Sequence, residues 1–476
     1  MECPRKNDRE WESVERKMAG TGQQPQRQMK LSLFAGHYHM AGWRHPKAYR
    51  DMSTNVASWV EIAQKLERAK FDALFIADSA SLAFFDNPKV FERSPFGSKI
   101  EPLLLCSALA MATKHLGLVS TVATSYKSPF DVAREVASLD LVSNGRAGWN
   151  VVTGVSAADA AQYGSDEYGR RAERYARGEE FVDVVLALWA SIEPGAFPAD
   201  KESGLHAALG KIHRVDHRGK YYSVAGPLTT SPSPQGRPLL VQAGQSAEGR
   251  EFAARIAEVI FTAWTEFDMA KRFYSDMKSR AAARNRDPDS IKILPGARII
   301  LGRTAAEAEE KEAFLDSLLD IDVCIERAIS GIADGNTGID LRNYPLDAPF
   351  PDLPEEVTSI LSGRSENHLA MARKYNLTLR DIVIRSATTN MHFTVRGSPK
   401  DIVDQLEHWF EDGAADGFNI MCSYLPDSLD DFIELVIPEL QRRGLFRREY
   451  EGTTLRENLG IPIAAIPPKT QPASAD

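Results

Sequence analysis

The stretch SPFDVAREVASLDLVSNGRAGWNVVTG, residues 128–154, decides the fold class of this chain. Its first half predicts an amphipathic helix over 129–142, because apolar residues recur there at steps of three or four. An Asn-Gly pair at 144–145 breaks that pattern, and the β-prone run 147–152 follows it. The run ends in polar residues and a second glycine, Gly154. A helix that leads into a buried strand with a polar carboxyl end is typical of the active face of a β/α barrel.

The same alternation runs through the rest of the chain. Candidate strands lie at residues 31–35, 73–77, 116–122, 147–152, 239–242, 259–263, 293–301 and 418–422. Helical patterns lie near residues 54–70, 101–114, 129–142, 173–190, 246–257, 268–284, 304–330 and 399–412. Strict alternation predicts an α/β fold with a parallel sheet, and eight units favour a closed TIM-like (β/α)8 barrel over an open sheet.

Two long stretches interrupt the alternation in a barrel that we expect to span residues 30–462. Residues 191–237 are rich in Pro and Gly and contain an apparent hairpin at 213–224. Residues 331–395 form the second interruption. Both are too long for ordinary connections, so we expect functional insertions that cover the substrate.

The composition limits where the protein acts and what it binds. Residues 1–29 are charged and Gln-rich, which predicts a disordered N-terminal leader, and residues 463–476 predict a C-terminal tail. No apolar run approaches the roughly 20 residues that span a bilayer. The net charge of −9 argues against binding to nucleic acid or to an anionic membrane, but it leaves room for a local basic pocket. The four cysteines lack CxxC spacing, which favours a reducing cytoplasm over a disulfide framework or a zinc site.

The run VQAGQSAEGREFAAR, residues 241–255, predicts an anion site. Gly244 allows a tight turn after a strand, and Ser246 stands at the N-cap of the next helix. Free backbone N–H groups, a hydroxyl and the positive end of a helix dipole together suit a phosphate. The alternative is an ordinary helix cap with no ligand.

Two further patterns could contribute polar groups to a site. In RRAERYARGEEF, residues 170–181, Arg171 and Tyr175 share one helical face and could clasp a phosphate. The alternative is a solvated basic face paired with nearby glutamates. Asp78 follows an apolar strand, where a carboxylate serves either a barrel's active site or a helix N-cap.

The loop GHYHMAGWRHP, residues 36–46, gathers His37, His39 and His45 with three aromatic or basic residues. A metal site lacks support, because an i, i+2 histidine pair has no third ligand nearby in the sequence. An aromatic-lined pocket with a proton-transfer histidine fits better, and a packed structural loop is the alternative. The sequence shows no P-loop, GxGxxG after a strand, HExxH or GxSxG.

Taken together, these runs resemble the flavin-dependent monooxygenases of the bacterial luciferase-like superfamily. The similarity is greatest to the branch of nitrilotriacetate, EDTA, dibenzothiophene-sulfone and long-chain-alkane monooxygenases. The matching runs are GHYHMAGWRHP, KFDALFIAD, the stretch 128–154, AERYARGEEF, VQAGQSAEGREFAAR, GAADGFNIM and VIPELQRRGLFRREYEGTTLRENLG. They span residues 31–461 in family order.

The resemblance implies a barrel that binds reduced FMN (FMNH2) at the carboxyl ends of its strands. The family's flavin contacts fall on Asp78, Thr121, Tyr175 and Ser246, with Asn150 near the flavin ring. The family commonly has His at the position of Arg171, and an Arg there can still contact the phosphate. We expect His37, His45 and Asn150 as catalytic residues and no metal.

The resemblance also implies the reaction and its partners. Reduced flavin would react with O2 to give a C4a-hydroperoxide, which transfers one oxygen atom to a small organic substrate. A separate NAD(P)H:flavin reductase would supply the FMNH2, and we expect a homodimer or homotetramer. A deazaflavin-dependent oxidoreductase of the same superfold and a non-catalytic flavin-binding barrel are the alternatives. The runs GWNVVTG and ELQRRGLF favour the monooxygenase branch.

Overall fold

A computed structural model describes residues 27–36, 38–95, 97–154, 157–164, 171–333, 340–352, 364–389 and 392–463. Most of the expected leader and all but the first residue of the expected tail lie outside these ranges. Met29 is fully buried, and its backbone N donates to Leu445 O at 2.8 Å. The packed chain therefore begins before the expected boundary at residue 30.

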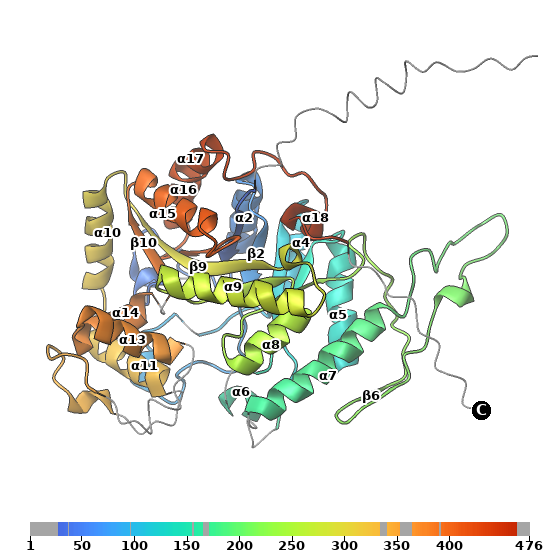
Figure 1. The fold of residues 1–476 in the computed structure, drawn as a ribbon, viewed down its shortest axis with the longest axis horizontal. Coiled ribbons are helices and arrows are strands. Elements are labelled where there is room, and N and C mark those ends of the chain that lie inside the picture. Colours follow the sequence, from blue (N-terminus) through green and yellow to red (C-terminus); the bar gives the residue numbers. More distant parts are fainter. Residues whose placement is uncertain are drawn as a thin grey trace, which may run out of the picture.

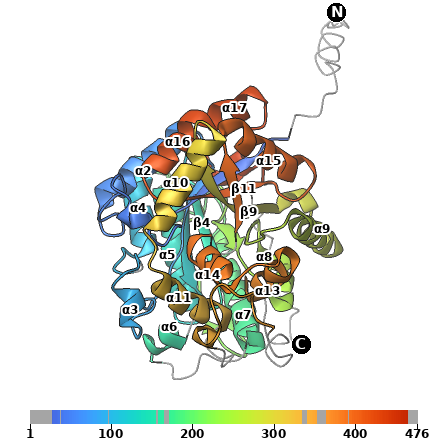
Figure 2. The same cartoon turned by 90° about the vertical axis from the view of Figure 1, so that its left-hand side faces the viewer.

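Eight parallel strands close into a barrel, which confirms the expected fold (Figures 1 and 2). The strands are β1 (Lys30–Phe34), β2 (Ala73–Ile76), β3 (Gly117–Ala123), β4 (Ala147–Val152), β7 (Leu239–Gln242), β8 (Val259–Thr262), β9 (Lys292–Leu301) and β11 (Gly417–Cys422). Each matches an expected strand to within one residue at either end. Pairing of β8 with β9 closes the ring, so all eight carboxyl ends meet at one rim.

Helices pack around the outside of the barrel. The longer ones are α2 (Val56–Arg68), α4 (Pro102–Ala112), α5 (Pro129–Val142), α7 (Arg171–Trp189), α8 (Ala247–Ile256), α9 (Phe267–Ala283), α10 (Ala305–Ser317) and α15 (Pro399–Glu411). The shorter ones are α3 (Pro88–Phe91), α6 (Ala157–Ala161), α16 (Asp427–Leu435), α17 (Ile437–Arg442) and α18 (Leu455–Leu459). Within the described ranges, no helix combines the length and apolar composition that crossing a bilayer requires.

The stretch 128–154 forms the unit that its sequence predicts. Ser128 caps α5 by accepting a hydrogen bond from Asp131 N, and Pro129 occupies the first helical position. The helix is followed by Asn144 and Gly145, which both have positive φ, at 57° and 83°. Two consecutive left-handed residues reverse the chain and direct it into β4.

The single helix expected over 304–330 is wrong, because the structure divides it into α10 and α11 (Ile321–Ala333). The division follows from Asp320, whose Oδ1 accepts from the backbone N atoms of Asp322 at 3.1 Å and Val323 at 3.4 Å. This side chain caps a new helix and competes with continuation of the old one. The two helices then pack in different places, α10 on β9 and α11 on a separate helical layer.

That layer contains α11, α13 (Arg364–Tyr375) and α14 (Leu379–Thr388), and we call these three helices the helical cap. It occupies much of the second interruption and has its own small hydrophobic core. The chain then returns through β10 (Phe393–Gly397), a strand that the sequence did not predict and that pairs with β9 outside the ring.

The helical cap lies over the carboxyl rim, because it contacts the loops that follow three barrel strands. Met40 N, after β1, donates to Ala387 O at 3.1 Å. Asn87 Nδ2, after β2, donates to Glu326 Oε2 at 3.1 Å. Glu266, after β8, pairs with Lys374. Contacts to three separate loops fix the helical cap above the barrel opening.

The first interruption takes a different path from the one we expected for a cover over the substrate. It joins the end of α7 to the start of β7, so it begins and ends on the side of the barrel opposite the carboxyl rim. Its hairpin, β5 (His217–Arg218) and β6 (Ser223–Val224), is shorter than expected and packs beside α7 through Glu180. The stretch between α7 and β5 projects away from the barrel at the right of Figure 1, whereas Leu228 and Gln235, after the hairpin, are buried.

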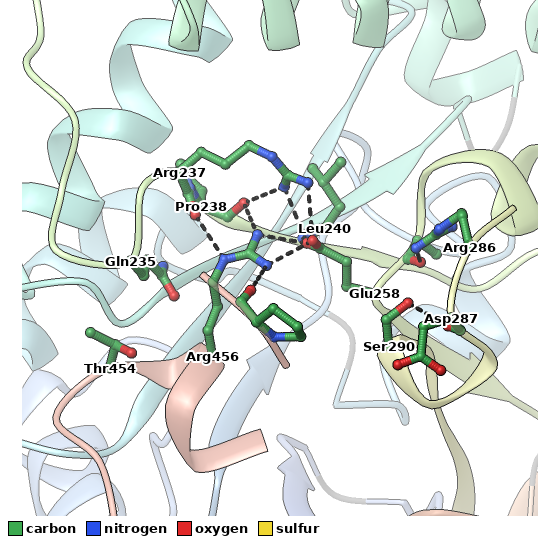
Figure 3. Close-up of polar contacts among 12 residues, drawn as sticks. Gln235, Arg237, Pro238, Leu240, Glu258, Arg286, Asp287, Ser290, Thr454 and Arg456 are labelled. Carbon is green, nitrogen blue, oxygen red and sulfur yellow. Dashed lines mark hydrogen bonds and ion pairs between the residues drawn. The ribbon is translucent and has the colours of Figure 1, made fainter. Parts of the chain in front are cut away.

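The amino end of the barrel is sealed by the C-terminal segment. Leu455 and Leu459 of α18 pack against lumen residues such as Val119 and Val241. The neighbouring Arg456 forms paired hydrogen bonds with Glu258, at 2.7 and 2.8 Å, and Arg237 does so from the other side (Figure 3). This buried Arg–Glu–Arg cluster ties the end of the chain to the barrel.

Replacing Glu258 with Gln should lower the free energy of unfolding by about 3 kcal/mol, because the buried Arg456 and the half-buried Arg237 lose their shared carboxylate. Urea denaturation at pH 7 measures the loss. Glu434→Gln, at an exposed position with no ion pair in the described structure, is the matched control and should change stability by less than about 0.5 kcal/mol.

The same cluster predicts how the difference in the free energy of unfolding between the wild type and Glu258→Gln depends on pH. Burial alone would raise the pKa of Glu258, but the two guanidinium groups lower it to about 2, below the ordinary value of 4.5. The carboxylate therefore contributes fully above pH 4.5, and its contribution falls as the pH drops toward 2. The difference in the free energy of unfolding between the wild type and Glu258→Gln should therefore become smaller between pH 4.5 and pH 2. A difference that stays constant would contradict this explanation.

Candidate active site

Three neighbouring strands carry a chain of hydrogen bonds near the carboxyl rim. The Thr121 hydroxyl donates to Ile76 O at 2.9 Å, so its one proton is used. Asn150 must therefore donate its Nδ2 to Thr121 Oγ1, which it does at 3.0 Å. Asn150 Oδ1 is buried and has no hydrogen-bond partner among the described residues. This arrangement points a fixed acceptor into the barrel, where a ligand N–H group could satisfy it.

An aromatic cluster lies beside these polar groups. The ring of Phe34, at the end of β1, lies 5.0 Å from that of Phe75 and 4.7 Å from that of Phe261. Tyr38 stacks on Phe34 at 5.0 Å. Burial holds the pKa of Tyr38 well above its usual range, so the phenol stays neutral. These rings give the upper lumen an apolar surface suited to a planar ligand.

The anion site expected after β7 has the geometry of a cradle. Ser246 caps α8 and accepts from Gly249 N at 3.1 Å, a contact that both the anion-site prediction and its helix-cap alternative require. A methyl group on Gly244 would lie 2.8 Å from the Cα of Gly249 and 3.0 Å from Tyr175 Oη. The two glycines thus bring the backbone, the tyrosine hydroxyl and the helix N-terminus together. We call Gly244, Ser246, Gly249 and Tyr175 the α8 cradle.

The α8 cradle adjoins Asn150 through the sheet. Asn150 pairs in register with Val241 of β7, and Gly244 follows Val241 by three residues. The structure therefore brings Asn150, Thr121, Tyr175 and Ser246 to one part of the rim. Arg171 begins α7 one turn before Tyr175, but its side chain lies outside the described part of the chain.

A cavity of about 540 Å³ opens at the carboxyl ends of β1 and β2. Asp78 lines it and pairs with Lys99 at 3.1 Å, and it caps no described helix. Arg327 of α11 and Ala387 of α14 complete its wall, so the helical cap forms part of it. No residue of 191–237 lines this cavity, and the first interruption therefore does not cover it.

The three histidines of the loop after β1 lie in different places. His37 lies outside the described residues. His39 is buried and contacts Asp316 at 3.0 Å. His45 stacks on Tyr424 at 3.9 Å and does not line the cavity, and burial lowers its pKa so that the ring is neutral near pH 7. No cluster of three potential metal ligands occurs among the described residues.

Several cavity residues have no signal in the sequence. Trp59 lies in the first turn of α2 and would be assigned to the core by its apolar spacing. Arg50 and Lys99 belong to loops, and Arg327 to a helix of the cap. They meet only because the loops after β1 and β2 and the helical cap converge above the same rim.

Comparison with known proteins places this geometry in a family. Residues 35–416 match the family model described as luciferase-like monooxygenase. Nitrilotriacetate monooxygenase component A from Aminobacter aminovorans is 43% identical over 431 residues, which cover 89% of this chain and 94% of that protein. N-acetyl-S-(2-succino)cysteine monooxygenase from Bacillus subtilis is 42% identical, with 91% and 97% of the two chains covered.

The fold agrees with the sequence comparison. The crystal structure of DmoA from Hyphomicrobium sulfonivorans matches with a TM-score of 0.82 at 30% identity. The match covers 92% of this chain and 94% of that one. The chain belongs to the luciferase-like monooxygenase family, and within it this protein is a flavin-dependent monooxygenase.

Proposed function

We propose that this chain is the oxygenase of a two-component system, which uses FMNH2 and O2 to insert one oxygen atom into a small organic substrate. The observation that carries the proposal is a buried, unpaired acceptor, Asn150 Oδ1, beside the α8 cradle. The words "component A" in the name of the Aminobacter aminovorans relative support a separate NAD(P)H:flavin reductase as the partner. FMNH2, when bound, would supply the electrons that activate O2.

The α8 cradle fits a phosphate group. It combines the N-terminal amides and positive dipole of a ten-residue helix with a tyrosine hydroxyl. The two glycines let Tyr175 approach the start of α8 closely, because a Cβ on either would lie within 3.0 Å of Tyr175 Oη. In the proposal, Tyr175 donates its hydroxyl to the FMN phosphate, and Ser246 orients the first turn of α8. Arg171 is a further phosphate contact carried over from the resemblance.

The flavin ring is proposed to lie over the upper lumen. Asn150 Oδ1 would accept a hydrogen bond from a ring N–H, and Thr121 holds the amide in the orientation that allows it. Phe34 offers an apolar surface at the cavity wall. Asp78 lies on the same wall at the end of β2 and is proposed as a flavin contact there.

Exclusion of water is the remaining requirement for an oxygenase. The helical cap closes one side of the cavity, and aromatic side chains line part of the remaining wall. A dry cavity would limit loss of the activated oxygen as hydrogen peroxide before it reaches the substrate. The catalytic roles of His37 and His45 stay predictions, as do the homodimer or homotetramer and the cytoplasmic location.

Ser246→Asp should weaken the contact to the FMN phosphate and leave the contacts to the rest of the flavin unchanged. Aspartate also caps helices, so α8 stays intact, but its charge would repel a phosphate. We expect at least a fivefold rise in the Kd for FMN under argon, with little change for riboflavin, which lacks the phosphate. Isothermal titration calorimetry measures both. Equal weakening of the two ligands would place the phosphate elsewhere.

Tyr175→Phe should raise the Kd for FMN about fivefold, the scale of one lost hydrogen bond worth about 1 kcal/mol. Tyr344→Phe, at an exposed position on another element, is the matched control and should bind FMN like the wild type. If the two variants bind FMN equally well, Tyr175 does not contact the phosphate.

Asn150→Leu should raise the Kd for FMN and the Kd for riboflavin by the same factor, about fivefold, because it removes a contact to the ring and not to the phosphate. The near-equal size of leucine limits changes in packing. A variant that binds both ligands like the wild type would show that Asn150 Oδ1 is not a flavin contact.

The reaction itself distinguishes the proposal from its two alternatives. Nitrilotriacetate and N-acetyl-S-(2-succino)cysteine, the compounds named for two relatives, are the first substrates to test. With FMN, NADH, a flavin reductase and 18O2, mass spectrometry should show one labelled oxygen atom in a product or its leaving fragment. Reduction of a substrate without O2 would favour the deazaflavin-type oxidoreductase, and flavin binding without O2 uptake would favour the non-catalytic barrel.

A further inference from the structure

We propose that Trp59 determines substrate specificity, with its indole N–H donating a hydrogen bond to an uncharged oxygen atom at the end of the substrate remote from the flavin. This inference rests on the proposed function, because it concerns the substrate of the same site. It follows from the unsatisfied indole, from the position of Trp59 relative to the barrel rim, and from the apolar walls around it.

The indole of Trp59 is a buried donor to which the described part of the protein offers no acceptor. The side chain lines the cavity and is 7% exposed. Its Nε1 has no hydrogen-bond partner within the part of the chain that the structure describes. An indole N–H can only donate, and leaving it buried and unpaired costs free energy. An oxygen atom of a ligand in the cavity would supply the missing acceptor.

The position of Trp59 separates it from the proposed flavin contacts. Phe34 and Asp78 line the cavity at the ends of β1 and β2, where the flavin is proposed to lie. Trp59 belongs to α2 and Leu105 to α4, two helices on the outside of the barrel, and both side chains line the same cavity. The cavity therefore extends from the rim into the space between these helices. A ligand that fills it would present its outer end, and not its reacting end, to the indole.

The walls of this outer part of the cavity are apolar. Met52 and Leu105 are buried and line it. Ile100 lines it too, and its backbone N donates to Ser53 O at 3.2 Å, which holds the segment before α4 against the segment before α2. Such walls favour the carbon skeleton of a ligand, and the indole N–H adds one directional contact that fixes its orientation.

An uncharged oxygen suits the outer part of the cavity better than a charged one. Of the cations that adjoin it in the sequence, Lys99 pairs with Asp78 at 3.1 Å and Arg50 is exposed to solvent. A charged group brought against the apolar walls would lose its hydration, at a high cost in free energy. A ketone, amide or ether oxygen loses less on desolvation, and the single donor of Trp59 can satisfy it.

The unpaired donor would also reject substrates without such an oxygen. A site that forms a hydrogen bond to one ligand discriminates against an analogue that lacks the acceptor, because the buried donor then stays unpaired. Trp59 would thus select the molecules that occupy the cavity, without contacting the atoms that react.

The test compares acetophenone with α-methylstyrene, which has CH2 in place of the ketone oxygen, on the FMN-loaded protein labelled with 15N-tryptophan. The seven tryptophans give at most seven indole signals in a 1H–15N correlation spectrum, and Trp59→Phe removes the signal of Trp59. Acetophenone should shift that signal downfield through the new hydrogen bond, and α-methylstyrene should not. Trp59→Phe should raise the Kd for acetophenone about fivefold and change the Kd for α-methylstyrene by less than about twofold.

Trp43→Phe is the matched control, because Trp43 lines the same cavity but is 42% exposed. It should change the Kd values for the two ligands by the same factor. If Trp59→Phe does not fold, Trp59→Tyr identifies the indole signal in its place, and the shifts are measured on the wild type.

Three results would overturn the inference. A Trp59 signal that acetophenone leaves unmoved up to its solubility limit would exclude the hydrogen bond. A variant that weakens both ligands equally would assign Trp59 to packing alone. Benzoate binding that depends on Trp59 more strongly than acetophenone binding would replace the uncharged oxygen with a carboxylate.

Repeating these titrations on flavin-free protein keeps the inference apart from the proposed function. Failure of FMN to bind the wild type would contradict the proposed function, and the preference for acetophenone would still be measurable at Trp59.

Discussion

The pairing of β8 with β9 is the constraint on which the rest of the structure depends. It closes a parallel sheet into a ring, and in a closed parallel ring every strand ends at the same rim. Residues far apart in the sequence, from Asp78 to Ser246, therefore meet at that rim. Because every lateral neighbour is fixed by the sheet, a single hydroxyl such as Thr121 can hold Asn150 in one orientation.

The two ends of the barrel have different roles, one in stability and the other in ligand binding. The amino end is filled by α18 and tied by Glu258 between two arginines. The carboxyl end keeps polar groups without partners and a cavity under the helical cap. An unsatisfied group is costly in a folded chain, so the buried Asn150 Oδ1 at the carboxyl end marks a place where a ligand is expected to contribute the missing contact.

The barrel could be predicted from the sequence because each strand and helix has a strong local period and defined caps, as in the stretch 128–154. The Ser246 cap and its turn were readable for the same reason. The division between α10 and α11 was missed because apolar residues continue at helical spacing through Asp320, the residue that caps α11. The strand β10 has a β-prone start, FTV at 393–395, but it was overlooked inside the second interruption. The arginines of the cavity carry no local signal, since Arg50 and Arg327 lie on elements that meet only above the rim. The first interruption was expected over the substrate because of its length alone. It follows the helix α7 and not a strand, so it starts at the end of the barrel opposite the carboxyl rim.

The central claim is that FMN spans from the α8 cradle to Asn150. A crystal structure of the protein with bound FMN tests it most directly. The account predicts phosphate oxygens within hydrogen-bonding distance of Tyr175 Oη and the first-turn amides of α8, and a ring N–H within about 3.2 Å of Asn150 Oδ1. A phosphate seated on Arg50 and Arg327, with the α8 cradle filled by water, would contradict it.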